Sequence, residues 1–254
     1  MDTVIGYAFG LFFLAISAYF GRRAWLYIGQ HRILAAANTT VTSLAPETVS
    51  TVSGTVRVDA PAADEHGDAG ILAWRIRERR PKGSGRSGGR FSWSTTDGGI
   101  DVGALTIDTD AGPVTVDAEA VRGLLAAGVS TPDPWNVPAL YLRKPERIER
   151  LDEGSELPVA VSTGPVSTEN RTQFEATTVE DGDQLLVHGR IIEENDRLVV
   201  TRTDDDPFIV SDGPLEQPIA DVRIRIATSA LFSAVLFAFA LAAIGGLFDT
   251  VTIG

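Results

Sequence analysis

The sequence contains no cysteine, and this absence excludes several classes of protein at once. Disulfide bonds, cysteine-ligated zinc sites, iron–sulfur clusters and thiol nucleophiles cannot form in these 254 residues. Lysine is nearly absent as well, because 20 of the 22 basic residues are arginine. The 34 acidic residues give a formal net charge of −12, and so acidic a chain is not expected to bind nucleic acid.

Two long uncharged runs explain a mean hydropathy of +0.07, which is high for so acidic a chain. They cover residues 4–20 and 227–248, and as helices they span roughly 26 and 33 Å at about 1.5 Å per residue. A buried core helix is the alternative, but both runs lie near the ends of the sequence and neither has a polar face. The sequence therefore predicts an integral membrane protein of the cell membrane with two transmembrane helices.

The charges beside these runs predict how the chain is oriented. Arg22 and Arg23 follow the first run, whereas a cleaved signal peptide carries its positive charge ahead of the apolar run, so we expect an uncleaved anchor. Five basic residues flank the central segment and none lies on the outer side of either run. The positive-inside rule then places the central segment in the cytoplasm. Glycosylation triplets at Asn38 and Asn170 would be used only in the reverse topology.

The sequence divides into residues 1–43 with the first transmembrane helix, a central segment 44–222, and residues 223–254 with the second transmembrane helix. The central segment holds 17 basic and 32 acidic residues, a net charge of −15. Asp outnumbers Glu by 20 to 14. An Asp-rich, Lys-poor surface suits high ionic strength, where screening weakens self-repulsion. We therefore predict a halophilic source and expect most acidic clusters to be solvated surface.

The central segment has the pattern of a β protein. Alternating and β-branched runs predict strands, and one stretch, 118–127, predicts a short helix. No βαβ rhythm is present, so we expect a mainly β fold: one compact domain, a small barrel or curled antiparallel sheets, between two transmembrane helices. The expected strands are 48–58, 70–79, 90–94, two within 105–116, 157–162, 173–179, 184–192, 197–203 and 208–211.

One cluster of charges stands out as a candidate site. Seven basic residues and one acid fall within 75–90, which inverts the charge of the surrounding segment. A hairpin tip that contacts anionic lipid headgroups is one interpretation. A solvated strand face whose arginines pair with neighbouring acids is the other, and the sequence leaves both open. The candidate residues are Arg75, Arg77, Arg79, Arg80, Lys82, Arg86 and Arg90.

No other motif predicts a catalytic, cofactor or metal site. His188 lies in an expected strand and is interpreted as structural. Residues 108–119 have some spacing of a calcium loop, but Pro113 stands where that loop requires glycine, so we expect a hairpin turn. The acids 204–206 are interpreted as surface, and 83–89 lacks the Lys-Ser/Thr pair of a phosphate-binding loop.

Several motifs occur in an order that resembles a known family, the GIDE or "beside a membrane" domain. The motifs are VSGTV at 52–56, AWRIRE at 73–78 and LTIDTDAGPVTV at 105–116, followed by 174–192, 198–200 and 207–212. The resemblance covers most of residues 22–248. It implies a domain between two membrane spans and a relation to mitochondrial membrane-anchored E3 ubiquitin ligases. Those ligases carry a RING after the second span, and a RING binds zinc through Cys and His ligands that this sequence does not supply.

Two functions follow as expectations. The first is a membrane-anchored, non-catalytic interaction or scaffold protein whose partners are the lipid bilayer and another protein. The second, implied by the resemblance alone, is an adaptor in ubiquitin-like protein modification without a RING of its own. A hydrolase is a distant third: Ser, Asp and His are all present, but the Gly- and Ser-rich stretch 83–89 does not open a helix, as a nucleophile elbow requires.

Overall fold

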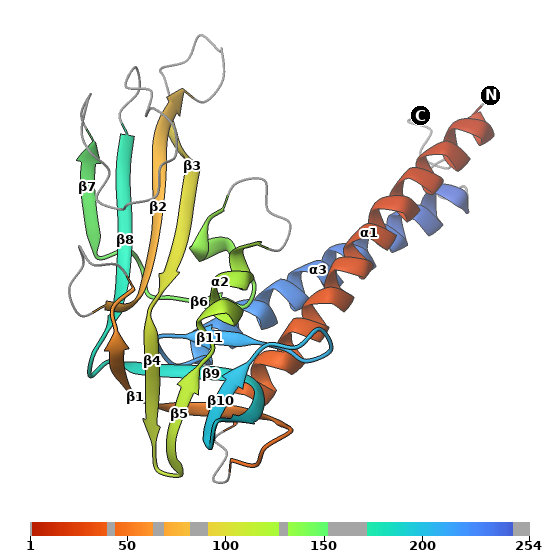
Figure 1. Cartoon of the computed structure of the whole chain (residues 1–254). Coiled ribbons are helices and arrows are strands. Elements are labelled where there is room, and N and C mark those ends of the chain that lie inside the picture. The colour runs from red at the N-terminus through yellow and green to blue at the C-terminus, as the bar shows by residue number, and fades with distance from the viewer. Residues whose placement is uncertain are drawn as a thin grey trace. The chain divides into compact units, whose positions relative to one another are not determined.

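A computed structural model shows how the chain folds and describes residues 2–39, 44–62, 69–81, 91–126, 132–151 and 172–245. It divides into two compact units (Figure 1). A helical unit combines Met1–Asn38 with Leu215–Gly254, and a β unit comprises Thr39–Pro214. The sequence placed the second boundary between 222 and 223. The structure moves it to 214 because the last helix begins at Glu216, ahead of its apolar run.

The helical unit is an antiparallel pair. Helix α1 runs over Asp2–Ala37 and helix α3 over Glu216–Ile244. Residues early in α1 lie beside residues late in α3. For example, a Cβ added to Gly6 would lie 3.3 Å from the carbonyl oxygen of Ala243. Near the other end, Arg223 of α3 donates a hydrogen bond to His31 of α1. Helix α1 continues beyond its apolar run as far as Ala37.

Five strands of the β unit close into a barrel. The strand order is β1-β4-β5-β10-β9, and β9 pairs again with β1. All pairs are antiparallel except β5 with β10. Numbered along the chain, the order is first, second, third, fifth, fourth, with helix α2 (Ala118–Ala126) between the third and fourth strands, which is the topology of the OB-fold. The barrel strands are β1 (Thr48–Ala60), β4 (Ala104–Thr109), β5 (Gly112–Val116), β9 (Gln184–Glu194) and β10 (Arg197–Thr201).

Closure depends on β1, which serves two neighbours. Its first half pairs with β9 and its second half with β4. Gly54 lies where the pairing changes, and a Cβ there would stand 2.1 Å from the carbonyl oxygen of Asp108 on β4. Only glycine permits this approach.

Two insertions into the barrel topology build a second, four-stranded sheet in the order β3-β2-β8-β7, all antiparallel. Strand β3 leads directly into barrel strand β4 through Gly103, where a Cβ would lie 2.0 Å from the carbonyl oxygen of Ala60. The insertion between α2 and β9 also contains the short helix η2 (Pro134–Asn136) and strand β6 (Leu140–Tyr141), which pairs with β11 (Ile209–Ser211). The second sheet comprises β2 (Ala69–Pro81), β3 (Phe91–Val102), β7 (Arg147–Leu151) and β8 (Thr172–Glu180).

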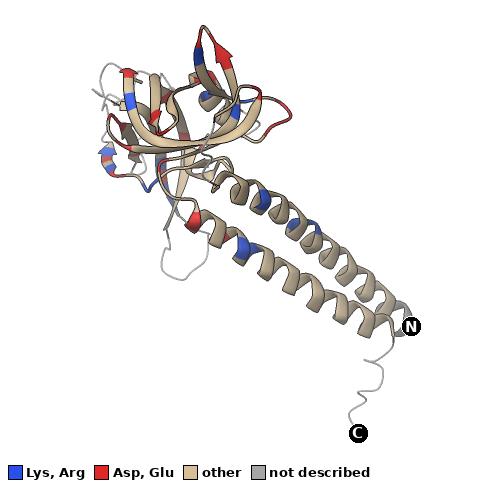
Figure 2. Ribbon diagram, turned by 90° about the horizontal axis from the view of Figure 1, so that it is seen from below, with Lys and Arg blue, Asp and Glu red and all other residues tan. Residues whose placement is uncertain are grey.

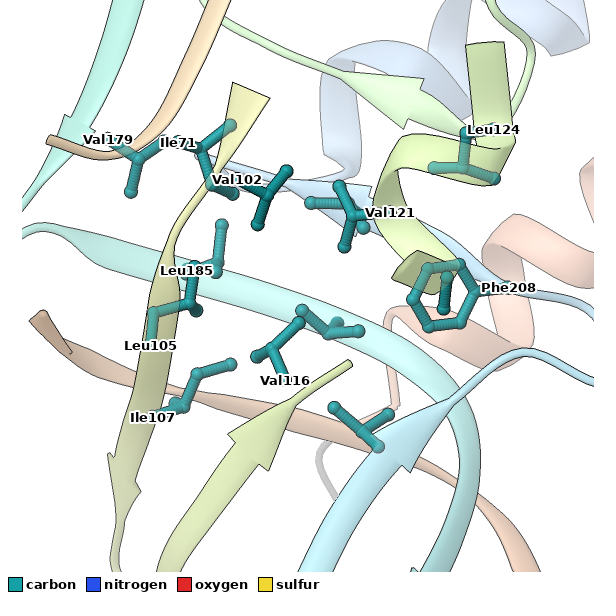
Figure 3. Packing of buried hydrophobic residues seen from close by; sticks show 14 of the residues in the cluster. Ile71, Val102, Leu105, Ile107, Val116, Val121, Leu124, Val179, Leu185 and Phe208 are labelled. Carbon is teal, nitrogen blue, oxygen red and sulfur yellow. The ribbon is translucent and has the colours of Figure 1, made fainter. Parts of the chain in front are cut away.

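One hydrophobic core joins the barrel to this sheet (Figure 3). Ile71 and Val179 contribute from the second sheet, Leu105 and Leu185 from the barrel, and Val121 from α2. All five side chains are buried. The β unit is therefore one domain, as the sequence predicted.

Most expected strands are confirmed, together with the helix at 118–126 and the turns that join β4 to β5 and β9 to β10. The expected strand 90–94 was too short, because β3 continues through Gly98 and Gly99 to Val102. Gly99 is required there, since a Cβ would lie 2.7 Å from the indole of Trp74. Strands β6 and β7 were not expected. The expected strand 157–162 and the loop 82–90 lie outside the described residues.

Candidate functional site

Helix α3 is long and apolar enough to cross a membrane, and it is the one helix among the described residues that meets this description. Only 11% of its most apolar stretch is buried. A core helix of a water-soluble domain would be mostly buried, so the apolar surface of α3 faces outward. Leu231, Phe237 and Leu241 are about half exposed. Helix α1 shows the same outward character, with Phe9, Leu11 and Phe12 more than half exposed.

The contact between α1 and α3 combines small and hydroxyl side chains with the aromatic pairs Phe13–Phe239 and Phe20–Phe232. Ser17 and Ser233 exchange hydrogen bonds, each hydroxyl donating to the other residue's carbonyl oxygen at 2.8 and 2.9 Å. Ala24 and Ala240 are buried in the pair. Gly10 leaves no room for a side chain, because its Cβ would lie 2.4 Å from Ile244. Small residues at the contact and large apolar residues on the outer surface are typical of packed membrane helices and not of a water-soluble helix pair.

Spacing along the sequence contained this signal. Gly6 and Gly10, Ser17 and Gly21, and Ser229 and Ser233 are each separated by three residues, which is the small-xxx-small spacing of packed membrane helices. The sequence reasoning used the length and hydropathy of the runs but missed this spacing, which indicates that the two runs pack against each other.

The basic residues of the helices lie in the second half of α1 and the first half of α3 (Figure 2). Arg23 lies between two tyrosines, with its guanidinium 5.8 Å from the ring of Tyr19 and 5.6 Å from that of Tyr27. It also donates a hydrogen bond to the Tyr27 hydroxyl at 2.7 Å. Trp25 is 72% exposed beside them. Aromatic and basic side chains in this combination are typical of the membrane–water interface.

In the β unit, the members of the candidate basic cluster differ in whether they form buried ion pairs. Arg75 and Arg77 both bind Glu175 of β8, with shortest contacts of 2.6 and 3.2 Å. Arg75 also binds Asp133, and its guanidinium stacks 4.7 Å above the ring of Trp135. Both carboxylates are buried. Arg75 is therefore held inside the fold and is not available to a lipid headgroup. The sequence grouped all seven basic residues as one candidate lipid contact, and Arg75 does not belong to it.

The other members of the cluster lie farther along the hairpin. Arg79 stacks on Phe91 with its guanidinium 4.0 Å from the ring centroid. Arg80 pairs with Glu78 at 2.8 Å and is exposed. Lys82, Arg86 and Arg90 lie outside the described residues. The interpretation as paired strand arginines therefore holds for Arg75, Arg77 and Arg80, whereas Arg79 lies on an aromatic ring.

Asp133 connects the second sheet to the short helix η2. It caps η2 by accepting from the backbone N–H of Trp135 at 3.1 Å, and it also accepts from Thr95 and Asn136 at 2.9 Å each. With Arg75 and Glu175 it forms a buried ionic network in which each carboxylate has several partners. Such a network fixes the register of β2, β3 and β8, and the sequence could not reveal it because Arg75 and Glu175 are 100 residues apart.

The other candidate residues from the sequence make contacts typical of structural residues. His188 is buried in β9, its Nδ1 lies 2.9 Å from the Thr51 hydroxyl, and burial lowers its pKa. Asp206 accepts hydrogen bonds from Arg190 and Thr203, which lower its pKa. The segment around Asp108 is a β4–β5 hairpin, as expected. Among the described residues, no group of three or more His, Asp or Glu side chains could hold a metal ion.

Comparison with known proteins adds no relative. No family model, curated protein or solved structure matches the chain.

Proposed function

We propose that the protein is a membrane-anchored, non-catalytic interaction module, in which α1 and α3 cross the bilayer as a hairpin and the β domain lies on the cytoplasmic side. The observation that carries the anchoring is the exposed apolar surface of the helix pair. Ser17 and Ser233 bond to each other across the contact between helices whose outer surfaces are apolar. In a bilayer this arrangement satisfies the hydroxyls and leaves the aromatic and aliphatic side chains in lipid.

The orientation is supported by the basic residues of the helix pair. Arg22, Arg23 and Arg32 on α1 and Arg223 and Arg225 on α3 belong to the ends that continue into the β domain. Arginine on the cytoplasmic side is favoured by the positive-inside rule. An interaction role for the β domain is supported by its OB-type barrel, a scaffold on which binding surfaces are commonly built.

Labelling of single cysteines tests this topology directly, because the natural chain has none to remove. Asp2→Cys and Asp249→Cys should react with a membrane-impermeant maleimide added to intact cells. Arg197→Cys, in the exposed turn that opens β10, should react only after the membrane is opened. Opposite accessibility of the two termini would show a single span, and labelling of Arg197→Cys from outside would reverse the orientation.

An adaptor role in ubiquitin-like protein modification is the second candidate. It is supported by the resemblance to the GIDE domain, whose quoted motifs fall on β1, β2, β4, β5, β8 and β9 of one continuous domain. Purification from native membranes distinguishes the two roles. A ubiquitin-like conjugation enzyme that co-purifies with the chain favours the adaptor, and its absence among the retained proteins favours a scaffold of another kind.

A further inference from the structure

One face of the second sheet places arginines beside exposed apolar rings. Arg77 lies opposite Thr95, Arg79 opposite Trp93, and Pro81 opposite Phe91 in the β2–β3 pairing. Directly opposed residues of an antiparallel pair project from the same side of the sheet. Arg77, Arg79, Phe91 and Trp93 therefore share one face.

The same face continues across the sheet to its other edge. Gln173 lies opposite Arg77 on one side and Arg150 on the other, and Glu175 lies opposite Ile148. Arg150 and Ile148 thus belong to the same face. We call this surface the aromatic–arginine face, and it consists of Arg77, Arg79, Phe91, Trp93, Ile148 and Arg150.

The apolar members of this face are exposed although they are large. Phe91 is 54% exposed, Trp93 38% and Ile148 56%. The opposite face of the same sheet buries its apolar residues, since Trp74 and Phe174 are almost completely enclosed. Three large apolar side chains on one face, at both edges of a sheet, indicate a surface that is covered in use.

The charge of this face opposes that of its domain. Residues 44–222 carry a net charge of −15, yet the register places four arginines (Arg75, Arg77, Arg79 and Arg150) and one acid, Glu175, on this side of the sheet. Glu175 is already shared between Arg75 and Arg77. The Arg79 guanidinium rests on the Phe91 ring, so this side of the sheet presents a cation beside an exposed aromatic ring.

We propose that the aromatic–arginine face is a second, peripheral membrane contact that binds the anionic headgroup region of a bilayer. Tryptophan and phenylalanine favour the depth of the headgroups, and arginine offers paired donors to lipid phosphate. The face extends across four strands, which suits a bilayer surface better than the groove that a single peptide strand would require. The proposal goes beyond the membrane anchoring above and uses it only to keep the domain close to lipid.

The lengths of the elements are compatible with this contact. Each helix extends beyond its apolar run toward the β domain in the sequence. These extensions are residues 21–37 of α1 and 216–226 of α3, and they span roughly 26 and 16 Å at 1.5 Å per residue. Strand β2 has 13 residues and spans about 43 Å at about 3.3 Å per residue. The hairpin is therefore longer than the helical stretch that separates the domain from the apolar runs.

Fluorescence of Trp93 in proteoliposomes tests the proposal with the full chain. The background variant Trp25→Phe with Trp135→Phe removes the exposed tryptophan of α1 and the half-buried one of η2, and Trp74 is buried. Brominated phosphatidylglycerol should quench the remaining emission, and the quenched part should disappear in Trp93→Phe. Replacing the lipid with brominated phosphatidylcholine should reduce the quenching severalfold at low salt.

Charge variants identify the arginines that matter. Arg79→Gln with Arg150→Gln should weaken the dependence on phosphatidylglycerol by about fivefold for each arginine at low salt. Arg122→Gln with Arg197→Gln removes the same charge from α2 and β10 and should leave the quenching unchanged. Circular dichroism confirms that each variant is folded.

Three results would overturn the lipid contact. If brominated lipid does not quench Trp93, the lipid contact is excluded. It is also excluded if the two pairs of arginine variants change the quenching equally. A Trp93 emission that responds to poly-glutamate but not to lipid would assign the face to an acidic peptide instead. Resistance to alkaline carbonate extraction reports the anchoring separately, so failure of the anchor is distinguished from failure of this contact.

Discussion

Ser17 and Ser233 are 216 positions apart in the sequence, and each donates its hydroxyl proton to the carbonyl oxygen of the other. These are the same carbonyls that accept hydrogen bonds within their own helices, so the two serines add interhelical bonds without breaking either helix. In lipid such bonds contribute about 0.6 kcal/mol on average. The close approach around them therefore depends more on small side chains than on the two hydroxyls.

The first prediction concerns this close approach. Gly10→Leu should separate α1 from α3, because even a Cβ at position 10 would lie 2.4 Å from Ile244. Ser17→Ala with Ser233→Ala should have a smaller effect, since it removes only the hydroxyls. Cysteines at positions 13 and 239, where the phenylalanine ring centroids are 6.1 Å apart, report the separation by oxidative cross-linking in native membranes.

Gly29 is the matched control, because a Cβ there would meet no atom within 4 Å. Gly29→Leu should leave the cross-linking yield close to that of the parent. Equal yields from Gly10→Leu and the parent would contradict the packing of the helix pair.

The buried ionic network gives the second prediction. Glu175→Ala should destabilise the β domain by about 3 kcal/mol, because it leaves Arg77 without its carboxylate partner and Arg75 with Asp133 alone in a low-dielectric setting. Glu119→Ala breaks an ion pair whose acid is 83% exposed and should cost less than about 1 kcal/mol. Denaturant unfolding followed by circular dichroism compares them, and a Glu175 effect no larger than that of Glu119 would show that the network is not structural.

The barrel seam gives the third prediction. Gly54→Ala should destabilise the domain by about 1–3 kcal/mol, because the added methyl group would overlap the backbone carbonyl of Asp108, which cannot move without opening the β1–β4 pairing. Gly213→Ala has open space around the new methyl group and should be nearly neutral. Thermal unfolding of the two variants should separate them by several degrees.

Local patterns in the sequence predicted the barrel strands well. The strands expected at 184–192 and 197–203 form a hairpin, and the first of them completes the barrel by pairing with β1. The OB-type order was not predictable, because it depends on β1 pairing with two strands and on the parallel pairing of β5 with β10. Strands β6 and β7 were missed because they are short and lack a clear apolar alternation.

The candidate site shows a similar limit. Counting charges along 75–90 identified the basic stretch but could not show which arginines are already paired. Glu175 and Asp133 are distant in sequence and reach Arg75 only because β8 and η2 lie beside β2. The sequence also could not show that Phe91 and Trp93 share a face with the arginines, because this depends on the register that places them opposite Pro81 and Arg79.

The fourth prediction uses the buried histidine. Burial lowers the pKa of His188 in the folded protein below its ordinary value of 6.5. Below pH 6.5 the unfolded chain therefore binds a proton that the folded chain does not, and the stability of the β domain falls as the pH decreases below 6.5. Melting temperatures between pH 8 and pH 5 should show this loss, and His188→Gln should reduce it. His31→Gln, in the helical unit, is the control, and an unchanged pH profile in His188→Gln would exclude His188 as its cause.

The last prediction concerns how salt affects the stability of the isolated β domain. Residues 39–214 form a compact unit and hold 17 basic and 30 acidic residues, a net charge of −13. Salt weakens both the repulsion among the acids and the attraction within ion pairs, but most of the pairs in this unit are partly exposed and contribute little. Repulsion should therefore dominate, and the melting temperature of the isolated 39–214 fragment should fall as KCl is reduced from molar to millimolar concentration. The fragment should show a β-type circular dichroism spectrum in molar KCl, and a fragment that stays unfolded there would mean that the β domain requires the helices. Equal melting temperatures at both concentrations would contradict the halophilic adaptation proposed from the Asp-rich, Lys-poor composition and leave the fold unaffected.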